Sequence, residues 1–508
     1  MFQDINFTSF NYNFIKIKDI SFILNEVLIS FFILYLIVLG IYISKKKYQF
    51  QIIPQISRIV LVLFIFSLLL SFNLPNIAES LFDNMLIMDS FLKFNKIFLT
   101  FIFILGTLIS PVYLKFFKIN RYEFFVFILV VFLGSSVLLM SNDFLVFYLA
   151  LELQSLTFYL LASLKKNSPF SVEAGLKYFM LGAISSGFLL FGVVLIYGLT
   201  GTINFFNLSL LLIGLDINSY FLAYPIIFGI FLVFTFFFFK LAAAPFHIWS
   251  PDVYEGSPLV SVLYMAVIPK FVFFLVLSRL IFFVFYEVFL IFDYYFTFVI
   301  ILSFIFSIFN ALQQKKFKRF FAYSSISHVG FMLMALNSLS VVGYVSFYFY
   351  LYVYTLMNLF VWCLLIVLKN PFKNSLYSFI LNLANLSKVN FALSFSFFIL
   401  LMSMAGIPPF IGFFSKFWVF LSALQSKQYF CLSFAIFSSI FSTYYYLRIV
   451  KIIFFEDSKY IPNIAPVGKT ASYVISFLTI SLILLFFFSD YFYTFIYYYY
   501  LKSFYLIS

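Results

Sequence analysis

One segment sets the architecture of this chain, and it reads Lys240-Leu-Ala-Ala-Ala-Pro245-Phe-His247-Ile-Trp-Ser-Pro251-Asp252-Val-Tyr-Glu255-Gly256-Ser-Pro258. The run before it, 221–239, carries no charge and is close to the roughly 20 apolar residues that a membrane helix needs. Pro245 lacks an N–H and clashes with the preceding turn, so the helix is expected to break there. Broken backbone at membrane depth occurs only where it is buried in protein or faces a water-filled cavity. The segment therefore predicts a broken membrane helix whose ionisable side chains have a function.

The composition is that of a polytopic helical membrane protein. Of the 508 residues, 65% are hydrophobic and only 10% are charged, whereas a soluble domain has about 25% charged residues. Apolar runs recur along the whole chain, which excludes a soluble protein with a polar surface. The formal net charge of +13 does not indicate nucleic-acid binding, because the basic residues cluster in short connections between apolar runs.

The apolar runs predict an all-α fold with about 14 transmembrane helices. The helix that ends in the segment quoted above is the seventh, and Pro408-Pro409 predicts a second broken helix, the twelfth. The expected spans are 22–43, 56–74, 91–114, 124–140, 144–164, 174–197, 221–244, 259–280, 289–312, 320–336, 341–368, 391–421, 429–454 and 471–491.

Two interrupted helices in corresponding halves of a chain indicate an inverted repeat. Helices seven and twelve are five spans apart, so we expect two five-helix repeats, at 124–280 and 281–455. Helices one to three, within 1–123, precede these repeats. A surface loop and helix fourteen, within 456–508, follow them.

The connections between the spans alternate in charge. Odd-numbered connections carry clusters of Lys and Arg, beginning with 45–47, whereas even-numbered ones carry few or none. Connection seven, the segment quoted above, is the exception, with two acids. The positive-inside rule places the odd connections on the cytoplasmic or matrix side and both termini on the opposite side. Because the excess of Phe, Tyr, Ile and Asn indicates an AT-rich organellar gene, we expect a mitochondrial inner membrane, with a bacterial plasma membrane as the alternative.

The sequence offers no motif for a redox centre or a nucleotide. Cys363 and Cys431 stand alone in apolar runs and no CxxC is present, so the thiols cannot build an iron–sulfur cluster or a zinc site. No GxGxxG follows a strand and no Walker-type lysine loop occurs. We expect this chain itself to bind no cofactor.

Among the ionisable side chains inside the apolar spans, four form the candidate site: Glu152, Lys240, Lys270 and Lys416. A charge at the centre of a membrane helix costs at least roughly 2.5–3.5 kcal/mol, so such residues are usually functional. A buried lysine can hold or release a proton near neutral pH, depending on whether a carboxylate stays close. We predict that Glu152 pairs with Lys240 and that Lys270 and Lys416 continue a proton relay laterally.

Each of these residues also has a structural interpretation. The amines of Lys240 and Lys270 could extend to an interface, and Lys416 could bond carbonyls freed by the Pro-Pro break. Glu152 is hardest to explain in this way, because its side chain cannot reach far.

Two histidines are weaker candidates. His247 could bond the carbonyls that Pro245 leaves free, and His328 could be a hydrogen-bonded core residue. The sequence leaves the structural and functional interpretations of both open.

Five motifs in order resemble the antiporter-like membrane subunits of respiratory complex I. The ending Tyr254-Glu-Gly-Ser-Pro258 is most similar to the branch called subunit 2, or subunit N in bacteria. The motifs are the segment 240–258 together with Leu151-Glu-Leu-Gln-Ser-Leu156, Gly175-Leu-Lys-Tyr-Phe-Met-Leu-Gly-Ala-Ile-Ser-Ser-Gly187, Tyr323-Ser-Ser-Ile-Ser-His-Val-Gly330 and Met404-Ala-Gly-Ile-Pro-Pro-Phe-Ile-Gly-Phe-Phe-Ser-Lys416.

The resemblance implies fourteen helices, two inverted repeats and a proton path made of a glutamate in helix five and lysines in helices seven, eight and twelve. These fall on Glu152, Lys240, Lys270 and Lys416. A further lysine in helix six of the family is matched by Lys177.

The same resemblance implies a subunit of an enzyme, NADH:ubiquinone oxidoreductase, that moves protons while other subunits transfer electrons from NADH to ubiquinone. NADH, flavin, iron–sulfur clusters and ubiquinone are then expected in those partner subunits. Neighbouring antiporter-like subunits and lipids would surround this chain.

Two other functions share some of these features. A cation/proton antiporter complex has the same helix-seven motif, but Ser257-Pro258 and Lys416 favour complex I. A scaffold subunit that conducts nothing would lose stability by keeping four buried charges.

Overall fold

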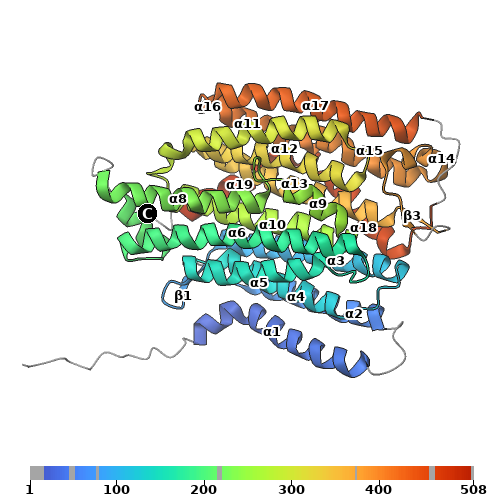
Figure 1. Ribbon diagram of the computed structural model, residues 1–508, viewed down its shortest axis with the longest axis horizontal. Coiled ribbons are helices and arrows are strands. Elements are labelled where there is room, and N and C mark those ends of the chain that lie inside the picture. The colour runs from blue at the N-terminus through green and yellow to red at the C-terminus, as the bar shows by residue number, and fades with distance from the viewer. Residues whose placement is uncertain are drawn as a thin grey trace, which may run out of the picture.

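The structure is a bundle of helices that run side by side (Figure 1). It is a computed structural model that describes residues 17–44, 52–75, 79–213, 220–371, 375–456 and 464–504. Within these ranges, 12 helices are long and apolar enough to cross a membrane. They are α1 (Ile17–Ser44), α2 (Ile52–Asn73), α3 (Ser90–Phe116), α4 (Glu123–Met140), α5 (Phe144–Ala162), α6 (Pro169–Thr200), α8 (Tyr220–Leu241), α10 (Leu259–Arg279), α11 (Phe289–Gln313), α13 (Val341–Val367), α17 (Tyr429–Phe454) and α18 (Lys469–Phe487).

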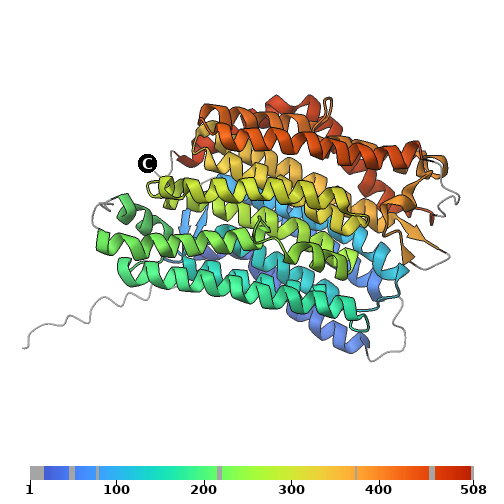
Figure 2. The same ribbon diagram turned by 45° about the horizontal axis from the view of Figure 1, so that its top comes forward.

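Shorter elements complete the bundle. In a second view of the molecule, the long helices again run in a common direction (Figure 2). The hairpin of β1 (Glu79–Leu81) and β2 (Leu86–Met88) and that of β3 (Lys369–Asn370) and β4 (Ser375–Leu376) are both antiparallel, and β1 and β3 lie at opposite ends of the bundle (Figure 1). The remaining elements are α7 (Phe205–Ile213), α9 (Trp249–Gly256), η2 (Leu280–Val284), α12 (Phe317–Asn337), η3 (Ile380–Leu383), α14 (Leu386–Val389), α15 (Phe391–Ala405), α16 (Ile411–Gln425) and α19 (Ser489–Phe504).

Most predicted spans coincide with observed helices to within a few residues, but two differ. The predicted span 391–421 is two helices, because α15 ends at Gly406, whose φ of +80° stops the helix. The predicted span 471–491 ends with α18, and α19 is a further helix that hydropathy did not reveal, because its tyrosines and Asp490 reduce its apolar character. Both termini and the basic stretch 45–47 lie outside the described residues.

Helix ends follow local sequence signals. The Asp89 carboxylate accepts a hydrogen bond from the Leu92 N–H at 2.6 Å at the start of α3, and the Ser168 hydroxyl accepts one from Ser171 N–H at 3.1 Å at the start of α6. Side-chain oxygens at this position satisfy N–H groups that have no helical partner. Gly201, with φ of +69°, ends α6. These caps set where the membrane helices begin and end.

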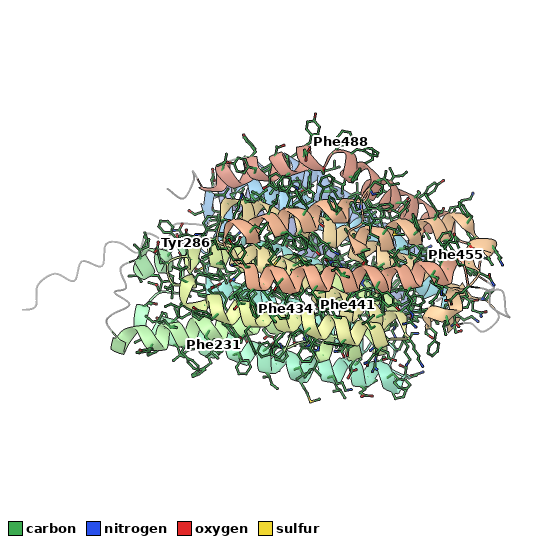
Figure 3. All side chains as sticks on the ribbon, turned by 90° about the horizontal axis from the view of Figure 1, so that it is seen from above. Phe231, Tyr286, Phe434, Phe441, Phe455 and Phe488 are labelled. Carbon is green, nitrogen blue, oxygen red and sulfur yellow. The ribbon has the colours of Figure 1, made fainter. Side chains whose placement is uncertain are left out.

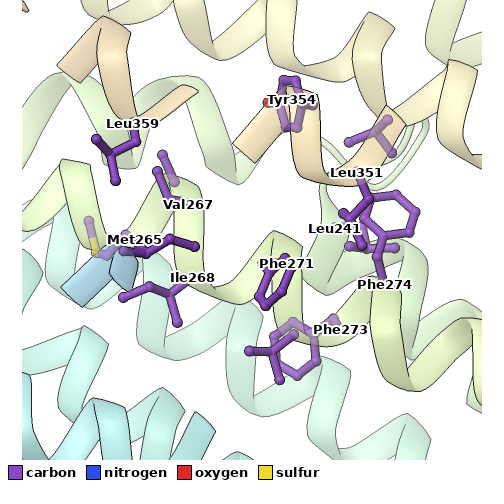
Figure 4. Close-up of a cluster of buried hydrophobic side chains, with 14 of the residues drawn as sticks. Leu241, Met265, Val267, Ile268, Phe271, Phe273, Phe274, Leu351, Tyr354 and Leu359 are labelled. Carbon is purple, nitrogen blue, oxygen red and sulfur yellow. The ribbon is translucent and has the colours of Figure 1, made fainter. Parts of the chain in front are cut away.

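Helices α10 and α13 form the centre of the bundle, and both are buried along their apolar windows. Phe271 and Phe274 of α10 pack in one cluster with Leu351 and Tyr354 of α13 (Figure 4). Between membrane helices such packing provides stabilisation through van der Waals contact rather than through exclusion of water. The central pair therefore provides a rigid frame for the ionisable groups that it carries.

The outer helices present apolar side chains to their surroundings. Tyr286 and Phe455 are exposed at opposite ends of the bundle, whereas Phe434 and Phe441 lie along the side of α17 (Figure 3). Such a surface suits lipid or neighbouring membrane subunits and not water.

Candidate functional site

The predicted break in the seventh span is present between α8 and α9. Helix α8 ends at Leu241, and Ala242, with φ of +58°, reverses the backbone. The N–H groups of Ala242 and Ala243 donate to Phe239 O and Phe238 O at 3.1 and 2.9 Å. The Trp249 indole N–H also donates to Phe239 O at 2.9 Å, so these carbonyls are satisfied although the helix stops in the middle of the bundle.

Lys240 lies in the last turn of α8, where exposed carbonyl dipoles favour a positive charge. Its side chain is buried. The amine lies 5.9 Å from the ring centroids of both Tyr159 and Phe236. No described residue makes a hydrogen bond to this amine.

Glu152 on α5 interacts electrostatically with Lys240, but the two side chains form no direct ion pair within the described chain. Ser155 Oγ donates to Glu152 Oε2 at 3.3 Å, and Tyr159, one turn further along α5, interacts with Ser155. The Ser155 hydroxyl therefore contacts the carboxylate and the Tyr159 ring lies beside the Lys240 amine, whereas the sequence predicted a direct pair between Glu152 and Lys240.

Tyr159 is held in this position by close packing against α6. A Cβ atom on Gly182 would lie 2.0 Å from the Tyr159 hydroxyl, so only glycine allows this approach. Tyr159 also contacts Tyr178 at 4.8 Å between ring centroids, and Tyr178 stacks on Trp249 at 4.9 Å. An aromatic wall thus connects α5, α6 and α9 beside Lys240.

Lys270 lies on α10 and is buried. Its amine donates to Ser325 Oγ of α12 at 2.7 Å and lies 5.9 Å from the Tyr354 ring. Leu241 and Phe271, the neighbours of Lys240 and Lys270 in the chain, belong to one apolar cluster (Figure 4). No hydrogen bond among the described residues connects the two lysines, and their chain neighbours Leu241 and Phe271 are buried and apolar.

His328 lies between Lys270 and Lys416. Its Nδ1 is 2.7 Å from the Tyr350 hydroxyl and its Nε2 is 3.4 Å from the Tyr446 hydroxyl. Both lysines interact with it electrostatically, and His328 and Lys416 line the same narrow gap. A side chain with two ring nitrogens in two hydrogen bonds can pass a proton from one side to the other.

Lys416 follows the break between α15 and α16, yet its amine returns to the end of α15. It donates to Ala405 O at 2.7 Å and to Ser442 Oγ at 3.4 Å. Its stem packs on Gly406, where a Cβ atom would lie 2.8 Å from Lys416 Cδ. Lys240 thus lies in the last turn of the half-helix before one break, and the Lys416 amine bonds the last residue of the half-helix before the other, although one lysine precedes and the other follows its break in sequence.

Lys177 and His247 lie apart from these four groups. The Lys177 side chain is 40% exposed and pairs with Glu173 at 2.8 Å and Asp252 at 3.3 Å. His247 packs against Phe306, 5.1 Å away between ring centroids, and interacts with the Pro245 carbonyl.

An ionic network surrounds Lys177 at one end of the bundle. Asp252 of α9 also pairs with Arg319 of α12 at 3.1 Å, and Glu255 pairs with Lys316 and Arg319. Sequence reasoning did not foresee that the two acids of the broken helix connect α6 to α12.

Sequence reasoning also missed a buried ion pair between α1 and α3. Lys96 Nζ lies 2.6 Å from Glu26 Oε1, and the two side chains are only 2% and 5% exposed. Both residues fall inside predicted apolar spans, which is the signal that could have revealed them. The hydroxyl partners Ser325, Tyr350 and Tyr446 carried no such signal, because Ser and Tyr are common in these helices.

Within the described ranges, no group of three or more His, Cys, Asp or Glu side chains is placed to hold a metal ion. The carboxylate, amine and imidazole groups of the site are of the kinds that bind and transfer protons.

Comparison with known proteins identifies the family. Residues 141–442 match the family described as "NADH:quinone oxidoreductase/Mrp antiporter, TM". NADH-quinone oxidoreductase subunit N of Pelagibacter ubique is 39% identical over 445 residues, 87% of this chain and 91% of that protein. NADH-ubiquinone oxidoreductase chain 2 of Marchantia polymorpha is 35% identical over 489 residues, 94% of this chain and 96% of that protein.

A solved structure has the same fold. A chain of respiratory complex I from Thermus thermophilus, solved with bound aureothin, superposes with a TM-score of 0.75 at 26% identity, covering 92% of this chain and 97% of that one. The chain therefore belongs to the subunit N and chain 2 family of NADH-quinone oxidoreductase, the antiporter-like membrane-arm subunits of respiratory complex I that take part in proton translocation.

Proposed function

We propose that protons cross this subunit through one lateral path that runs from Glu152 through Lys240 and Lys270 to Lys416. His328 links the last two. Electron transfer from NADH to ubiquinone in other subunits would drive the movement. The observation that carries the proposal is that His328 interacts electrostatically with both Lys270 and Lys416, and that all three side chains are buried within one bundle. Hydrogen bonds to Ser325 and Tyr350 hold Lys270 and His328 in place.

The geometry gives each group a distinct task. The ends of α8 and α15 favour an ammonium at Lys240 and at Lys416. A carboxylate close to a buried lysine favours its charged form, so movement of Glu152 relative to Lys240 controls whether that lysine keeps its proton. A proton arriving at Lys270 repels one held at His328 or Lys416, because like charges disfavour each other in a low-dielectric interior.

The apolar region between Lys240 and Lys270 sets the condition for transfer. Apolar side chains neither donate nor accept protons, so water must connect the two lysines or these side chains must move for the proton to pass. This step is where conformational changes in the rest of the complex can control proton movement.

The proposed architecture has fourteen transmembrane helices with two inverted repeats, 124–280 and 281–455, flanked by 1–123 and 456–508. Two features support this division. Each repeat contains a helix interrupted in the middle, and each interrupted helix ends with a residue of positive φ, Ala242 or Gly406. In each, a lysine is associated with the last turn of the first half-helix, Lys240 by its position in that turn and Lys416 by its hydrogen bond to Ala405 O.

The proposed location is the mitochondrial inner membrane, with the bacterial plasma membrane as the alternative, since relatives occur in both. The basic odd-numbered connections would face the matrix and neither terminus would. Neighbouring antiporter-like subunits and lipids would cover the exposed apolar helices. NADH, flavin, iron–sulfur clusters and ubiquinone would be bound by partner subunits.

Glu152→Gln in the assembled complex tests the proposal. Gln keeps the shape and the hydrogen bond from Ser155 but cannot be a charged partner of Lys240. We expect NADH-driven acidification in proteoliposomes to fall several-fold, as loss of a positioned acid or base costs on the order of 10² or more in proton-transfer rate.

Glu173→Gln is the matched control, because Glu173 is an exposed acid of the neighbouring helix. The control should pump normally. Unchanged pumping by an assembled Glu152→Gln complex would remove Glu152 from the path, and a requirement for sodium would instead favour a cation/proton antiporter.

A further inference from the structure

A cavity of about 350 Å³ opens at the end of the bundle where the β1–β2 hairpin lies. Its walls come from helices α3, α7, α10 and α13 and from the connections between the predicted spans. Those connections are the second, fourth, sixth and eighth, which contribute residues 79–89, 142, 205–209 and 283–284. These connections have few basic residues, so the positive-inside rule places the cavity on the side opposite the basic connections. The volume has room for on the order of ten water molecules.

Asp89 is the acid that lines this cavity at the start of α3. It is half-buried and accepts a hydrogen bond from Leu92 N–H at 2.6 Å. Burial raises the pKa of Asp89, and the nearby Arg279 lowers that pKa only in part. Asp89 therefore takes up a proton at a higher pH than an aspartate in water.

The charged and titratable neighbours of Asp89 leave it available for proton exchange. Arg279 of α10 donates to Ser141 O and Leu139 O, both at 3.0 Å, and forms no ion pair with Asp89 in the described chain. Glu79 of β1 and the tyrosines Tyr344 and Tyr348 of α13 complete the titratable lining.

We propose that this cavity is a water-filled proton vestibule, and that Asp89 binds protons there and exchanges them with the aqueous phase on the side of the even-numbered connections. This role lies outside the path from Glu152 to Lys416, and it depends on the proposed function only for the source of the protons.

Polar groups continue from the cavity towards the centre of the bundle. Asn95 lines the cavity and accepts a hydrogen bond from the Tyr352 hydroxyl at 2.5 Å. Tyr348 and Ser278 share a hydrogen bond of 2.6 Å. Tyr344, Tyr348 and Tyr352 are four residues apart, so they follow one face of α13 inward.

This polar face ends at an aromatic barrier close to Lys270. The ring of Tyr352 lies 5.1 Å from that of Phe98 and 6.1 Å from that of Phe271, the residue after Lys270. Movement of Phe271 would connect Lys270 with the vestibule.

The proposed transfer conserves protons and charge. A proton released from Lys270 passes over water and the hydroxyls, each of which accepts one proton and donates another. The Asp89 carboxylate binds the proton as a carboxylic acid and then releases it to bulk water, which restores the carboxylate.

Thiol labelling tests whether water reaches the cavity. Leu275→Cys places a thiol in the cavity wall, whereas Leu277→Cys, two residues along α10, is buried away from it. The native Cys363 and Cys431 are buried. A small, charged, membrane-impermeant thiol reagent should label Leu275→Cys at least tenfold faster from the side of the even-numbered connections than from the other side, and should leave Leu277→Cys unlabelled. Equal or no labelling of the two variants would overturn the vestibule.

Asp89→Asn tests the role of the acid in the intact complex. Asn is as good a helix cap as Asp but cannot carry the proton, so pumping per NADH oxidised should fall several-fold. Asp143→Asn is the control, since Asp143 lies at the start of α5 at the same end and bonds Asn204 at 2.7 Å outside the cavity lining.

Normal pumping by Asp89→Asn would refute the role of Asp89. If Glu152→Gln abolishes pumping while Asp89→Asn does not, the vestibule fails and the lateral path stands. Should Asp89→Asn not assemble, thiol labelling of the Leu275→Cys complex still decides whether the vestibule exists.

Discussion

Lys240→Met is expected to reduce NADH-driven proton pumping roughly tenfold or more while the complex still assembles, because a positioned proton carrier contributes on the order of 10²–10⁴ in rate. Methionine matches the length of the lysine stem and fills the same buried space between Tyr159 and Phe236. Since no described residue makes a hydrogen bond to the Lys240 amine, the substitution leaves no buried partner unsatisfied. Pumping is measured by acidification of proteoliposomes, and assembly by native gels.

Lys177→Met provides the matched control for this experiment. Lys177 is also a lysine of the first repeat, but it is 40% exposed and pairs only with partly exposed acids. Surface ion pairs contribute about 0–1 kcal/mol, so this variant should assemble and pump normally. If Lys240→Met pumps as well as Lys177→Met, the role of Lys240 is structural.

Glu26→Gln or Lys96→Met is expected to destabilise the subunit by roughly 3–5 kcal/mol, the cost of leaving one buried charge without its partner. The pair joins α1 to α3, and Glu26 Oε2 and Asn25 Oδ1 have no other hydrogen-bond partner among the described residues. Among the described residues, no second basic side chain forms an ion pair with Glu26 that could compensate for the loss of Lys96. The yield of assembled complex and its half-life on heating should both fall.

The double variant Glu26→Gln/Lys96→Met should recover most of this loss, because it removes both buried charges together. Single variants that are as stable as the unmodified complex would show that water or lipid already neutralises the pair. A double variant no better than the singles would assign the loss to packing and not to charge.

The positions of most long helices were predictable from the sequence, because a membrane span needs about 20 apolar residues and such runs are easy to recognise. The predicted number of about 14 spans exceeds the 12 helices that are long and apolar enough to cross a membrane among the described residues. The break at Pro245 followed from the missing N–H of proline. The length of an apolar run does not reveal a single residue with positive φ, so the sequence predicted one span through Gly406 where the structure has two helices.

The contacts of the candidate site were less predictable. Glu152 and the three lysines could be recognised because charges are rare in membrane helices, but their partners come from other helices. The hydroxyl group that forms a hydrogen bond with Lys270 or His328 is determined by the relative orientation of α10, α12 and α13 about their axes, which the sequence does not give. Lys177 shows the same limit, because its sequence position in a long apolar helix did not reveal that it joins an ionic network at the end of the bundle.

Whether the buried groups act in series is tested most directly by the number of protons pumped per NADH in Lys240→Met, Lys416→Met and the double variant, each in assembled complex. Residues that act as one unit give losses that do not add. A single path predicts that the double variant pumps as many protons per NADH as whichever single variant pumps fewer. A double variant whose loss equals the combined losses of the two singles would contradict a single path through this subunit.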